Sequence, residues 1–268
     1  MTDLRIRRWI FLGLAVIVVL TMLVPVTTKV TVSPYTQRMY DYIDSLPAHS
    51  VVMVSFDHDA SSQPEIRPLS LCLLRHAFSR GLKMAGVSFQ SEGTVIGYRM
   101  IEQTAKEFGR EYGVDYVYLG FRPQLQAAIL QLGESIRGLY AQDYFGTPLD
   151  SIPMLVGIDS LAQIAVVLSI ADANNTTHWM EYGKARFNVP IIAGVTASMV
   201  TSYDPYLSSG QLSAMVGGLR GAAEYERLLN RHGAGQRGML AQSATHLYLI
   251  ALILTGNFIF LRARRGKK

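Results

Sequence analysis

Five short runs of hydrophobic residues stand in the middle of the chain, and segments with the periodicity of helices separate them. The runs cover residues 51–56, 82–89, 114–121, 162–171 and 189–197. Continuous apolar runs of this length are typical of parallel strands buried on both faces, whereas a half-exposed strand alternates apolar and polar residues. The pattern therefore predicts an α/β fold. We expect a doubly wound, mostly parallel five-stranded sheet with helices on both faces, in a Rossmann-like arrangement.

The helices are predicted from apolar residues that recur every three or four positions. They cover residues 36–45, 64–80, 94–112, 123–141, 177–186 and 210–229. Gly81 and Gly113 directly follow two of them, as expected of residues that end a helix. Residues 154–158 fit a helix or an edge strand. The strand, polar loop and helix within residues 189–229 are expected to close the domain.

Both ends of the chain carry long apolar segments. Residues 9–26 are 18 residues without a charge, and residues 247–261 form a second apolar run that small and neutral residues extend back to 239. A helix needs about 20 apolar residues to cross the hydrocarbon core of a bilayer. We therefore expect transmembrane helices at residues 9–28 and 239–261. The competing interpretations are a cleaved signal peptide and a buried core helix, respectively.

The net charge of +5 is concentrated at the two ends of the chain. Residues 1–8 contribute +2 and residues 262–268 contribute +5, so the remaining 253 residues carry −2. A body of this charge has no basic surface for nucleic acid. The positive-inside rule predicts that both basic ends are cytoplasmic and lie near anionic membrane lipid. Residues 30–238 would then form one extracytoplasmic domain of a two-pass protein of the cell membrane.

Candidate ligand-binding residues follow from the predicted sheet. In doubly wound sheets, ligands bind beyond the carboxyl ends of the strands, near the point where the strand order reverses. The polar residues expected there are Asp57, His58, Asp59, Gln90, Ser91, Arg122, Asp172, Asn174, Thr196 and Ser198. The set suits a small polar molecule, and no cofactor is predicted from it.

Asp57 and Asp59 form the sharpest local pattern. If the strand geometry continues through both, their carboxylates point to the same side, and a hard cation could bridge them. The pattern resembles the first motif of the haloacid-dehalogenase-type phosphotransferases, although no late acidic pair completes a magnesium site. The alternative is structural, with both carboxylates binding turn amides and capping the helix that begins at Pro64. No catalytic residue and no metal ligand is assigned.

Cys72 is the only cysteine, so the chain forms neither an intrachain disulfide nor a cysteine-based zinc site. Cys72 and His76 stand four residues apart on one face of a predicted helix, a spacing open to a nucleophile with its base or to a metal pair. The apolar helix around them and the lack of a third ligand favour a structural role.

Gly217, Gly218 and Gly221 resemble a phosphate-binding loop in spacing. A dinucleotide-binding fingerprint requires its glycines directly after a strand. Here the last predicted strand ends near residue 197, so the glycines are expected inside the helix 210–229. We therefore predict that they allow close packing against the sheet or against another subunit.

Two segments resemble a family of uncharacterised prokaryotic membrane proteins with two terminal spans and one α/β ectodomain. They are FDHDASSQPEIRPLSLCLLRHAF at residues 56–78 and VPIIAGVTA with SSGQLSAMVGGLRGAAEYE within residues 189–226. The first is also loosely similar to the extracytoplasmic domain of gliding-motility-type ABC transporter accessory proteins. The resemblance implies the fold and the two-pass topology, and it brings no catalytic residues.

Three functions remain open at this point. The first is a binding or scaffold module in a membrane complex, such as a transporter accessory protein, in a homo-oligomer or with other membrane proteins. The second is a membrane-tethered hydrolase or phosphotransferase that uses Asp57 and Asp59. The third is a sensor of a small molecule, for which the chain is short if two full lobes are required.

Overall fold

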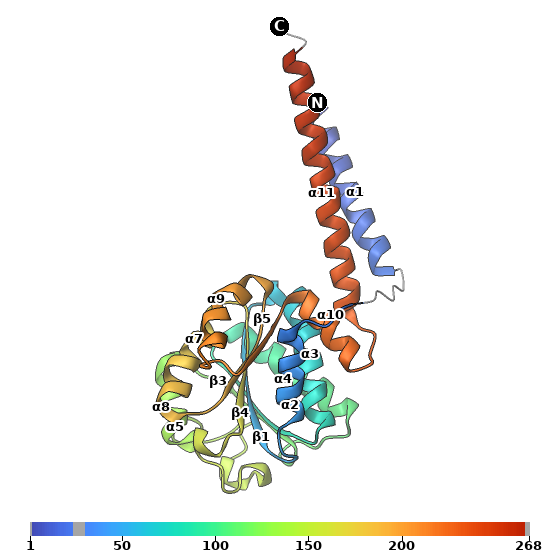
Figure 1. Ribbon diagram of the computed structural model, residues 1–268. Coiled ribbons are helices and arrows are strands. Elements are labelled where there is room, and N and C mark those ends of the chain that lie inside the picture. The colour runs from blue at the N-terminus through green and yellow to red at the C-terminus, as the bar shows by residue number, and fades with distance from the viewer. Residues whose placement is uncertain (1, 24–29, 266–268) are drawn as a thin grey trace. The chain divides into compact units, whose positions relative to one another are not determined.

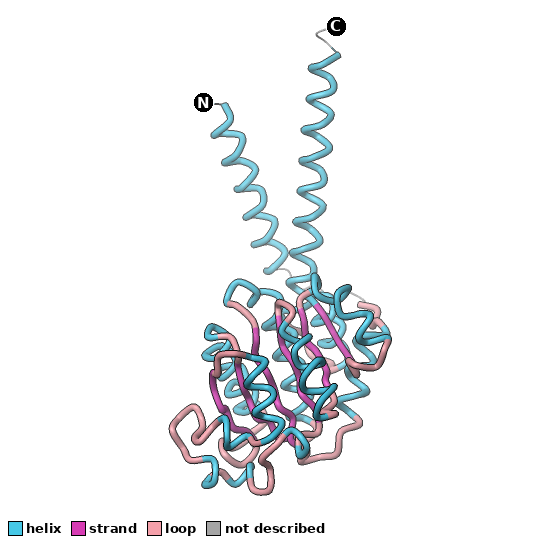
Figure 2. Tube along the Cα trace, turned by 90° about the vertical axis from the view of Figure 1, so that its left-hand side faces the viewer, coloured by secondary structure: helices cyan, strands magenta, loops and turns pink. Residues whose placement is uncertain are grey.

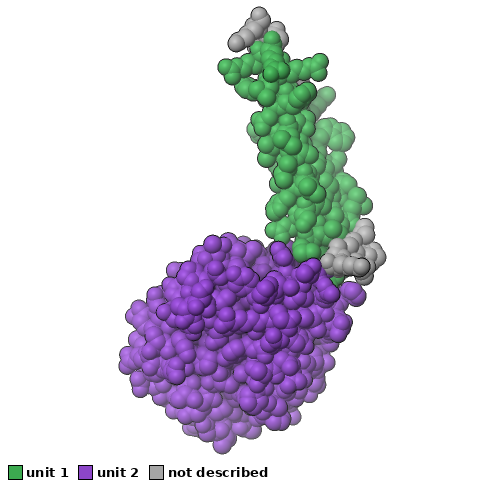
Figure 3. All heavy atoms as spheres, viewed as in Figure 1, with its two compact units in different colours: residues 1–29, 236–268 green, residues 30–235 purple. Residues whose placement is uncertain are grey.

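The computed structural model describes residues 2–23 and 30–265, and the chain divides into two compact units. One unit comprises residues 30–235, and the other comprises the terminal segments 1–29 and 236–268 (Figure 3).

A parallel sheet forms the centre of residues 30–235 (Figures 1 and 2). Its six strands lie in the order β3-β2-β1-β4-β5-β6, and every neighbouring pair is parallel. The strand order reverses between β1 and β4, which is the switch point of a doubly wound fold. The strands are β1 (Val51–Asp57), β2 (Lys83–Ser88), β3 (Tyr116–Phe121), β4 (Val166–Ala171), β5 (Ile191–Val195) and β6 (Ala214–Gly217).

Helices cover both faces of the sheet, because each face carries its own apolar core. One core packs the sheet against α5 (Leu125–Glu134), the π-helix Trp179–Lys184 and α9 (Ala197–Ser208). The other packs it against α2 (Pro34–Asp44), α3 (Gln63–Ser79), α4 (Ser91–Glu107) and α10 (Gly218–Leu228). Shorter helices are α6 (Ile136–Leu139), α7 (Asn175–His178), α8 (Ala185–Phe187) and the 3₁₀ turns Ala60–Ser62, Leu149–Ser151, Pro153–Leu155 and Leu161–Gln163.

The predicted α/β class, the parallel sheet and the helices on both faces are confirmed, but the number of strands is wrong. The sheet has six strands because Ala214–Gly217 forms β6 beside β5. The predicted helix 210–229 is therefore a short strand followed by α10, and the predicted polar loop before it contains α9. A strand of four residues is too short to show a period, and its apolar residues also fit one face of a helix.

Gly217 and Gly218 consequently stand at a strand-to-helix turn and not inside a helix. Gly218 has a φ of +70°, which side chains other than glycine's rarely adopt. A methyl group on Gly217 would clash with Val200 of α9, and one on Gly221 would lie 2.6 Å from Val216. The close packing predicted for these glycines is thus present, although the turn itself was not foreseen.

Most other differences concern boundaries. The predicted helix 123–141 is broken at Ser135 into α5 and α6, and the segment 154–158 contributes only the end of a 3₁₀ turn. Ser135 has extended backbone angles, and its hydroxyl accepts a hydrogen bond from the Gly138 amide to start α6. This local capping competes with continuation of the helix.

The terminal unit contains one helix, and all but the first two residues of a second, that are long and apolar enough to cross a membrane. They are α1 (Thr2–Leu23) and α11 (Ala234–Arg265), and their most apolar windows have mean hydropathies of 2.0 and 1.8. The Tyr248 hydroxyl donates a hydrogen bond of 3.2 Å to the Ile10 carbonyl, and a side chain on Gly13 would collide with the Tyr248 ring. Gly13 thus lets the two helices approach closely. The residues predicted at 24–28 of the first span lie outside the described part of the chain.

Helix α10 holds both ends of the residue 30–235 unit. The Arg227 guanidinium donates a hydrogen bond to the Val30 carbonyl, and Glu224 accepts one of 2.9 Å from the Ser33 amide. At the other end, Glu226 accepts a hydrogen bond of 2.7 Å from the Gly235 amide. The segment that leads into the unit and the one that leads out of it are therefore fixed to the same eleven-residue helix.

Candidate functional site

The carboxyl ends of β1, β4 and β5 bring four of the predicted residues together at the switch point. The Asp59 amide donates a hydrogen bond of 2.7 Å to the Asp172 carboxylate. Thr196 contacts the Asp172 carbonyl at 3.5 Å and the Ser198 hydroxyl at 3.0 Å. The contact between Asp59 and Asp172 joins residues 113 positions apart in the chain, because the ends of the neighbouring parallel strands β1 and β4 share an edge.

Asp57 is the last residue of β1 and is completely buried. Its carboxylate accepts hydrogen bonds from the Ser55 hydroxyl at 2.5 Å and from the Phe89 amide at 2.8 Å. Burial raises the pKa of Asp57 to about 6, against the effect of these two donors. Both carboxylate oxygens are thus used to hold the end of β1 to its own strand and to the end of β2.

Asp57 and Asp59 do not form the shared cation site that their spacing suggested. Asp59 is exposed and precedes the 3₁₀ turn Ala60–Ser62, whereas Asp57 is enclosed by the core. Strand alternation ends at Asp57, so it no longer relates the directions of the two side chains. The proposed capping of the helix by Asp59 is also not seen, because its side chain makes no capping hydrogen bond.

His58 is buried between these two residues. Its Nδ1 lies 3.2 Å from the Gln63 side-chain nitrogen, and its Nε2 has no hydrogen-bond partner among the described residues. Burial lowers the pKa of His58, although Asp59 and Asp172 oppose this. The neutral imidazole is therefore the stable form in the folded protein at neutral pH.

Carboxylates from neighbouring elements occupy the helix N-termini around the switch point. Glu65 accepts a hydrogen bond of 2.6 Å from the Ala197 amide at the start of α9, and Glu92 accepts one of 2.8 Å from the Ala60 amide. Asp172 plays the same part for the Asp59 amide. Amides at these positions are where Rossmann-like folds bind phosphate. Here the chain supplies the anions itself.

Glu65 and Glu92 were not among the predicted site residues. Each lies in the first turn of its own helix, where acidic residues are common because they stabilise the helix dipole. From the sequence, each glutamate is expected to stabilise the start of its own helix. In the structure, each one instead accepts a hydrogen bond from an amide of a different element.

Gln90 and Ser91 begin α4 at the end of β2. Gln90 precedes the first helical residue, and its side-chain oxygen is buried without a partner among the described residues. Ser91 is the first residue of the helix and is exposed. Neither has a hydrogen bond to Asp57, Asp59 or Asp172 among the described contacts.

Arg122 and Asn174 lie farther from the centre of the site. Arg122 follows the edge strand β3, donates a hydrogen bond to the Leu139 carbonyl and stacks on the Tyr140 ring at 4.4 Å. Strand β2 separates β3 from β1, so Arg122 belongs to a different part of the carboxyl edge. Asn174 is exposed and precedes α7 without a side-chain capping bond.

Cys72 and His76 are both buried in α3 but face different surroundings. His76 stacks on Tyr40 at 4.2 Å and lies 2.8 Å from the Tyr225 hydroxyl. Burial lowers the pKa of His76 to about 4 and raises that of the Cys72 thiol. Neither residue is activated for chemistry at neutral pH.

No group of three or more His, Cys, Asp and Glu side chains in residues 2–23 and 30–265 is placed to hold a metal ion. Searches against protein-family profiles, curated protein sequences and solved structures gave no match to this chain.

Proposed function

We propose that the chain is a two-pass membrane protein whose Rossmann-like domain is a binding or scaffold module for another membrane protein. The observation that carries this proposal is the use of Glu65, Glu92 and Asp172 at the carboxyl edge. Their carboxylates take the amides that a nucleotide or phosphorylated substrate would need. With Asp57 also buried, this favours a binding role over phosphoryl transfer.

The membrane part of the proposal is supported by α1 and α11 and by the basic residues at their outer ends. The positive-inside rule gives both termini to the cytoplasm and the domain to the other side. A fluorescent protein that matures only in the cytoplasm, fused after Lys268, is expected to fluoresce. The same protein inserted in the loop 141–148 should stay dark. The reverse result would contradict this topology.

An exposed aromatic surface is the candidate binding site for the partner protein. Tyr144 and Phe145 are 41% and 55% exposed, and they pack with Tyr98 and Tyr112 beside the edge strand β3. The Tyr144 amide donates a hydrogen bond to the Tyr118 carbonyl and so covers part of that edge. Exposed aromatic side chains are enriched at protein interfaces.

The test is site-specific photo-crosslinking of the full-length chain in its native membrane. A photoreactive residue in place of Phe145 is expected to capture one discrete membrane-anchored protein. The same residue in place of Val95, which is 47% exposed on α4, serves as the control. Equal products from both positions, or no product from either, would contradict a partner on this surface.

The phosphotransferase alternative makes a different prediction. It requires Asp57 to reach a substrate, so Asp57→Asn would abolish turnover of a phosphorylated compound. If the domain is a binding module, Asp57→Asn should leave partner binding unchanged, because Asp57 is buried beneath the surface. Turnover that the wild type shows and the variant lacks would favour the enzyme.

A further inference from the structure

A cleft of about 430 Å³ lies beside the edge strand β6, away from the switch point between β1 and β4. It is lined by the start of α2, the first half of α9, β6 and α10. All of these elements belong to the residue 30–235 unit, so the cleft does not involve the terminal helices. Its volume is within the range of small-molecule sites in proteins.

The walls of this β6 cleft are mostly apolar. Val200 of α9 lines one side, and Met215 and Val216 of β6 line another. Gly217 and Gly221 add backbone without a side chain, which leaves room between α9 and α10. A cleft of this kind binds a molecule chiefly because apolar surface is removed from water on both sides.

Most polar side chains of the lining already have partners. The Ser33 and Thr36 hydroxyls donate to the Glu224 carboxylate at 2.5 and 2.6 Å. The Tyr35 hydroxyl donates a hydrogen bond of 2.8 Å to Asp204 and so connects α2 with α9 beside the cleft. These contacts fix the shape of the β6 cleft, because they hold three of its four elements together.

The β6 cleft carries no net charge, and its remaining polar groups are donors. Arg220 and Glu224, the charged residues of the lining, form an ion pair through Arg220 Nε at 2.9 Å. The Nη groups of Arg220 and the Thr201 hydroxyl have no hydrogen-bond partner among the described residues. Both side chains are exposed at the rim of the cleft. The lining therefore suits a neutral molecule that carries a hydrogen-bond acceptor.

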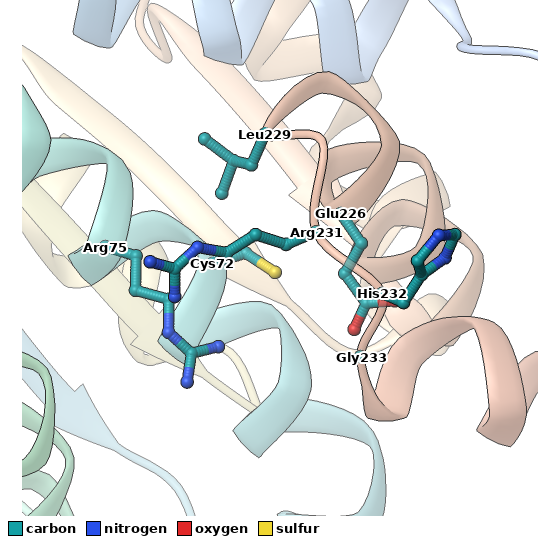
Figure 4. Close-up of a pocket in the computed structure, with 7 residues that line it drawn as sticks. All are labelled: Cys72, Arg75, Glu226, Leu229, Arg231, His232 and Gly233. Carbon is teal, nitrogen blue, oxygen red and sulfur yellow. The ribbon is translucent and has the colours of Figure 1, made fainter. Parts of the chain in front are cut away.

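A second cavity, of about 330 Å³, lies between α3 and residues 226–233 and differs in its chemistry (Figure 4). Its two arginines, Arg75 and Arg231, both bind the Glu107 carboxylate, at 2.7 and 3.2 Å. Glu226, which also lines it, accepts a hydrogen bond from the Gly235 amide. The positive charges of this cavity are thus matched, and its walls are more polar than those of the β6 cleft. The apolar walls of the β6 cleft make it the stronger candidate for a small-molecule site.

We propose that the β6 cleft binds a neutral, mostly apolar small molecule that carries a carbonyl oxygen. The apolar part packs against Val200 and Met215, and the carbonyl accepts hydrogen bonds from Thr201 and Arg220 at the rim. Residues 33–36 also line the cleft, so the bound molecule stabilises the attachment of this segment to α10. The inference depends neither on the protein partner nor on the membrane topology of the proposed function.

The test compares three naphthalene derivatives of similar shape, all substituted at the same ring position. Acetylnaphthalene is neutral and carries a carbonyl, naphthoate carries a carboxylate, and ethylnaphthalene carries no acceptor. The full-length chain in detergent, isotope-labelled at its methionine methyl groups, is titrated with each probe and followed by NMR. Met215 reports the β6 cleft, and Met84 of β2 reports the buried core. Met22 of α1 is 45% exposed and reports probe that has dissolved in the detergent.

Acetylnaphthalene is expected to shift the Met215 signal in a saturable way and to leave the Met84 signal in place. Ethylnaphthalene should bind about fivefold more weakly, because it cannot accept a hydrogen bond. Naphthoate should bind at least about tenfold more weakly than acetylnaphthalene, because its carboxylate loses water without gaining an unpaired positive charge.

Thr201→Trp should fill the cleft and abolish the saturable shift of the Met215 signal. Ser202→Trp is the matched control, because Ser202 is the next residue of α9, is exposed and does not line the cleft. It should respond as the wild type does. An unchanged Met84 signal before titration shows that each variant is folded, so a lost response in Thr201→Trp reports the cleft itself.

Three results would overturn the proposal. One is a Met215 shift that follows the Met22 shift without saturation, which would mean that the probe acts only through the detergent. Another is the same saturable shift in Thr201→Trp as in the wild type. The third is binding of naphthoate or ethylnaphthalene that is as tight as that of acetylnaphthalene, which would contradict the assigned chemistry of the ligand.

Discussion

The Glu224 carboxylate accepts a hydrogen bond of 2.6 Å from the Thr36 hydroxyl, which ties α10 to the first turn of α2. The same carboxylate accepts hydrogen bonds from the Ser33 amide and hydroxyl and from Arg220. Burial alone would raise the pKa of Glu224, but these donors lower it. The contact fixes the N-terminal segment of the domain, and its removal should be costly.

Glu224→Ala is expected to destabilise the domain by about 2–4 kcal/mol, because it leaves the buried Thr36 hydroxyl and the half-buried Ser33 donors without their acceptor. Thr36→Val should cost about 1 kcal/mol, since it removes one of them. Urea unfolding followed by Trp179 fluorescence measures both. Glu102→Ala removes an exposed ion pair with Lys106 and should change stability by less than about 0.5 kcal/mol. An equal loss in the Glu102 and Glu224 variants would contradict this role.

The Glu224 contact also has a pH dependence. A carboxyl group with a lowered pKa in the folded state stabilises the fold above its unfolded pKa, and this stabilisation is lost as the pH falls through the folded value. The wild type should therefore lose stability below about pH 4.5, the ordinary range of a glutamate. Glu224→Gln should lack this part of the acid transition.

Asp57 should give the stability of the fold the opposite dependence on pH. Its pKa is raised to about 6, so between its unfolded pKa and pH 6 the folded state binds more protons than the unfolded state. The neutral Asp57 carboxyl therefore makes its whole contribution to the free energy of unfolding below the unfolded pKa. This contribution is lost as the pH rises through about 6.

Asp57→Asn should remove this loss and stabilise the protein at pH 7 by an amount on the order of 2 kcal/mol. The amide can still accept from Phe89 and can donate to Ser55. Unfolding curves at pH 5 and pH 7 for both proteins provide the measurement. A variant that is less stable than the wild type at pH 7 would show that the carboxylate itself is required.

Glu65→Ala should vacate the N-terminus of α9. The loss of the contact to the Ala197 amide is expected to cost about 1 kcal/mol, as for other helix caps. The freed amides should then bind added sulfate or phosphate, so these ions should raise the melting temperature of the variant more than that of the wild type. Glu134→Ala, an exposed glutamate on α5, is the control. A wild type that responds as strongly as the Glu65 variant would show that the carboxylate does not occupy the anion position.

His76 is expected to stay neutral in the folded protein until the pH approaches 4, because burial lowers its pKa to about 4. The unfolded state takes up the proton first, so stability from the neutral ring is present above the unfolded histidine pKa and falls as the pH decreases. NMR titration of the His76 ring tests this. A ring that becomes charged well above pH 4 would contradict the effect of burial on His76.

The class of fold could be predicted from the sequence because most strands are continuous apolar runs that are visible without knowledge of the rest of the structure. The run at residues 51–56 is apolar throughout and is buried throughout in β1. β6 was missed because its four residues carry no period and because Gly217 and Gly218 look like helix-packing residues. The turn at Gly218 exists only because a strand precedes it. Without β6, the whole segment 210–229 is predicted as one helix.

The candidate site was predicted in part. Asp59, Asp172 and Thr196 do meet, since the carboxyl ends of parallel strands share an edge. The hydrogen bonding that holds Asp57 in place could not be predicted, because one partner is the Phe89 amide just beyond the neighbouring strand β2. Likewise, the distance of Arg122 from the centre follows from the strand order, which local patterns do not encode.

The attachment of both chain connections to α10 has a mechanical consequence. A pull on the segment at Val30 is carried by Arg227, and a pull on Gly235 is carried by Glu226, one residue away on the same helix. Tension that reaches the domain at either end is therefore shared between the backbone and a hydrogen bond to the same turn of α10.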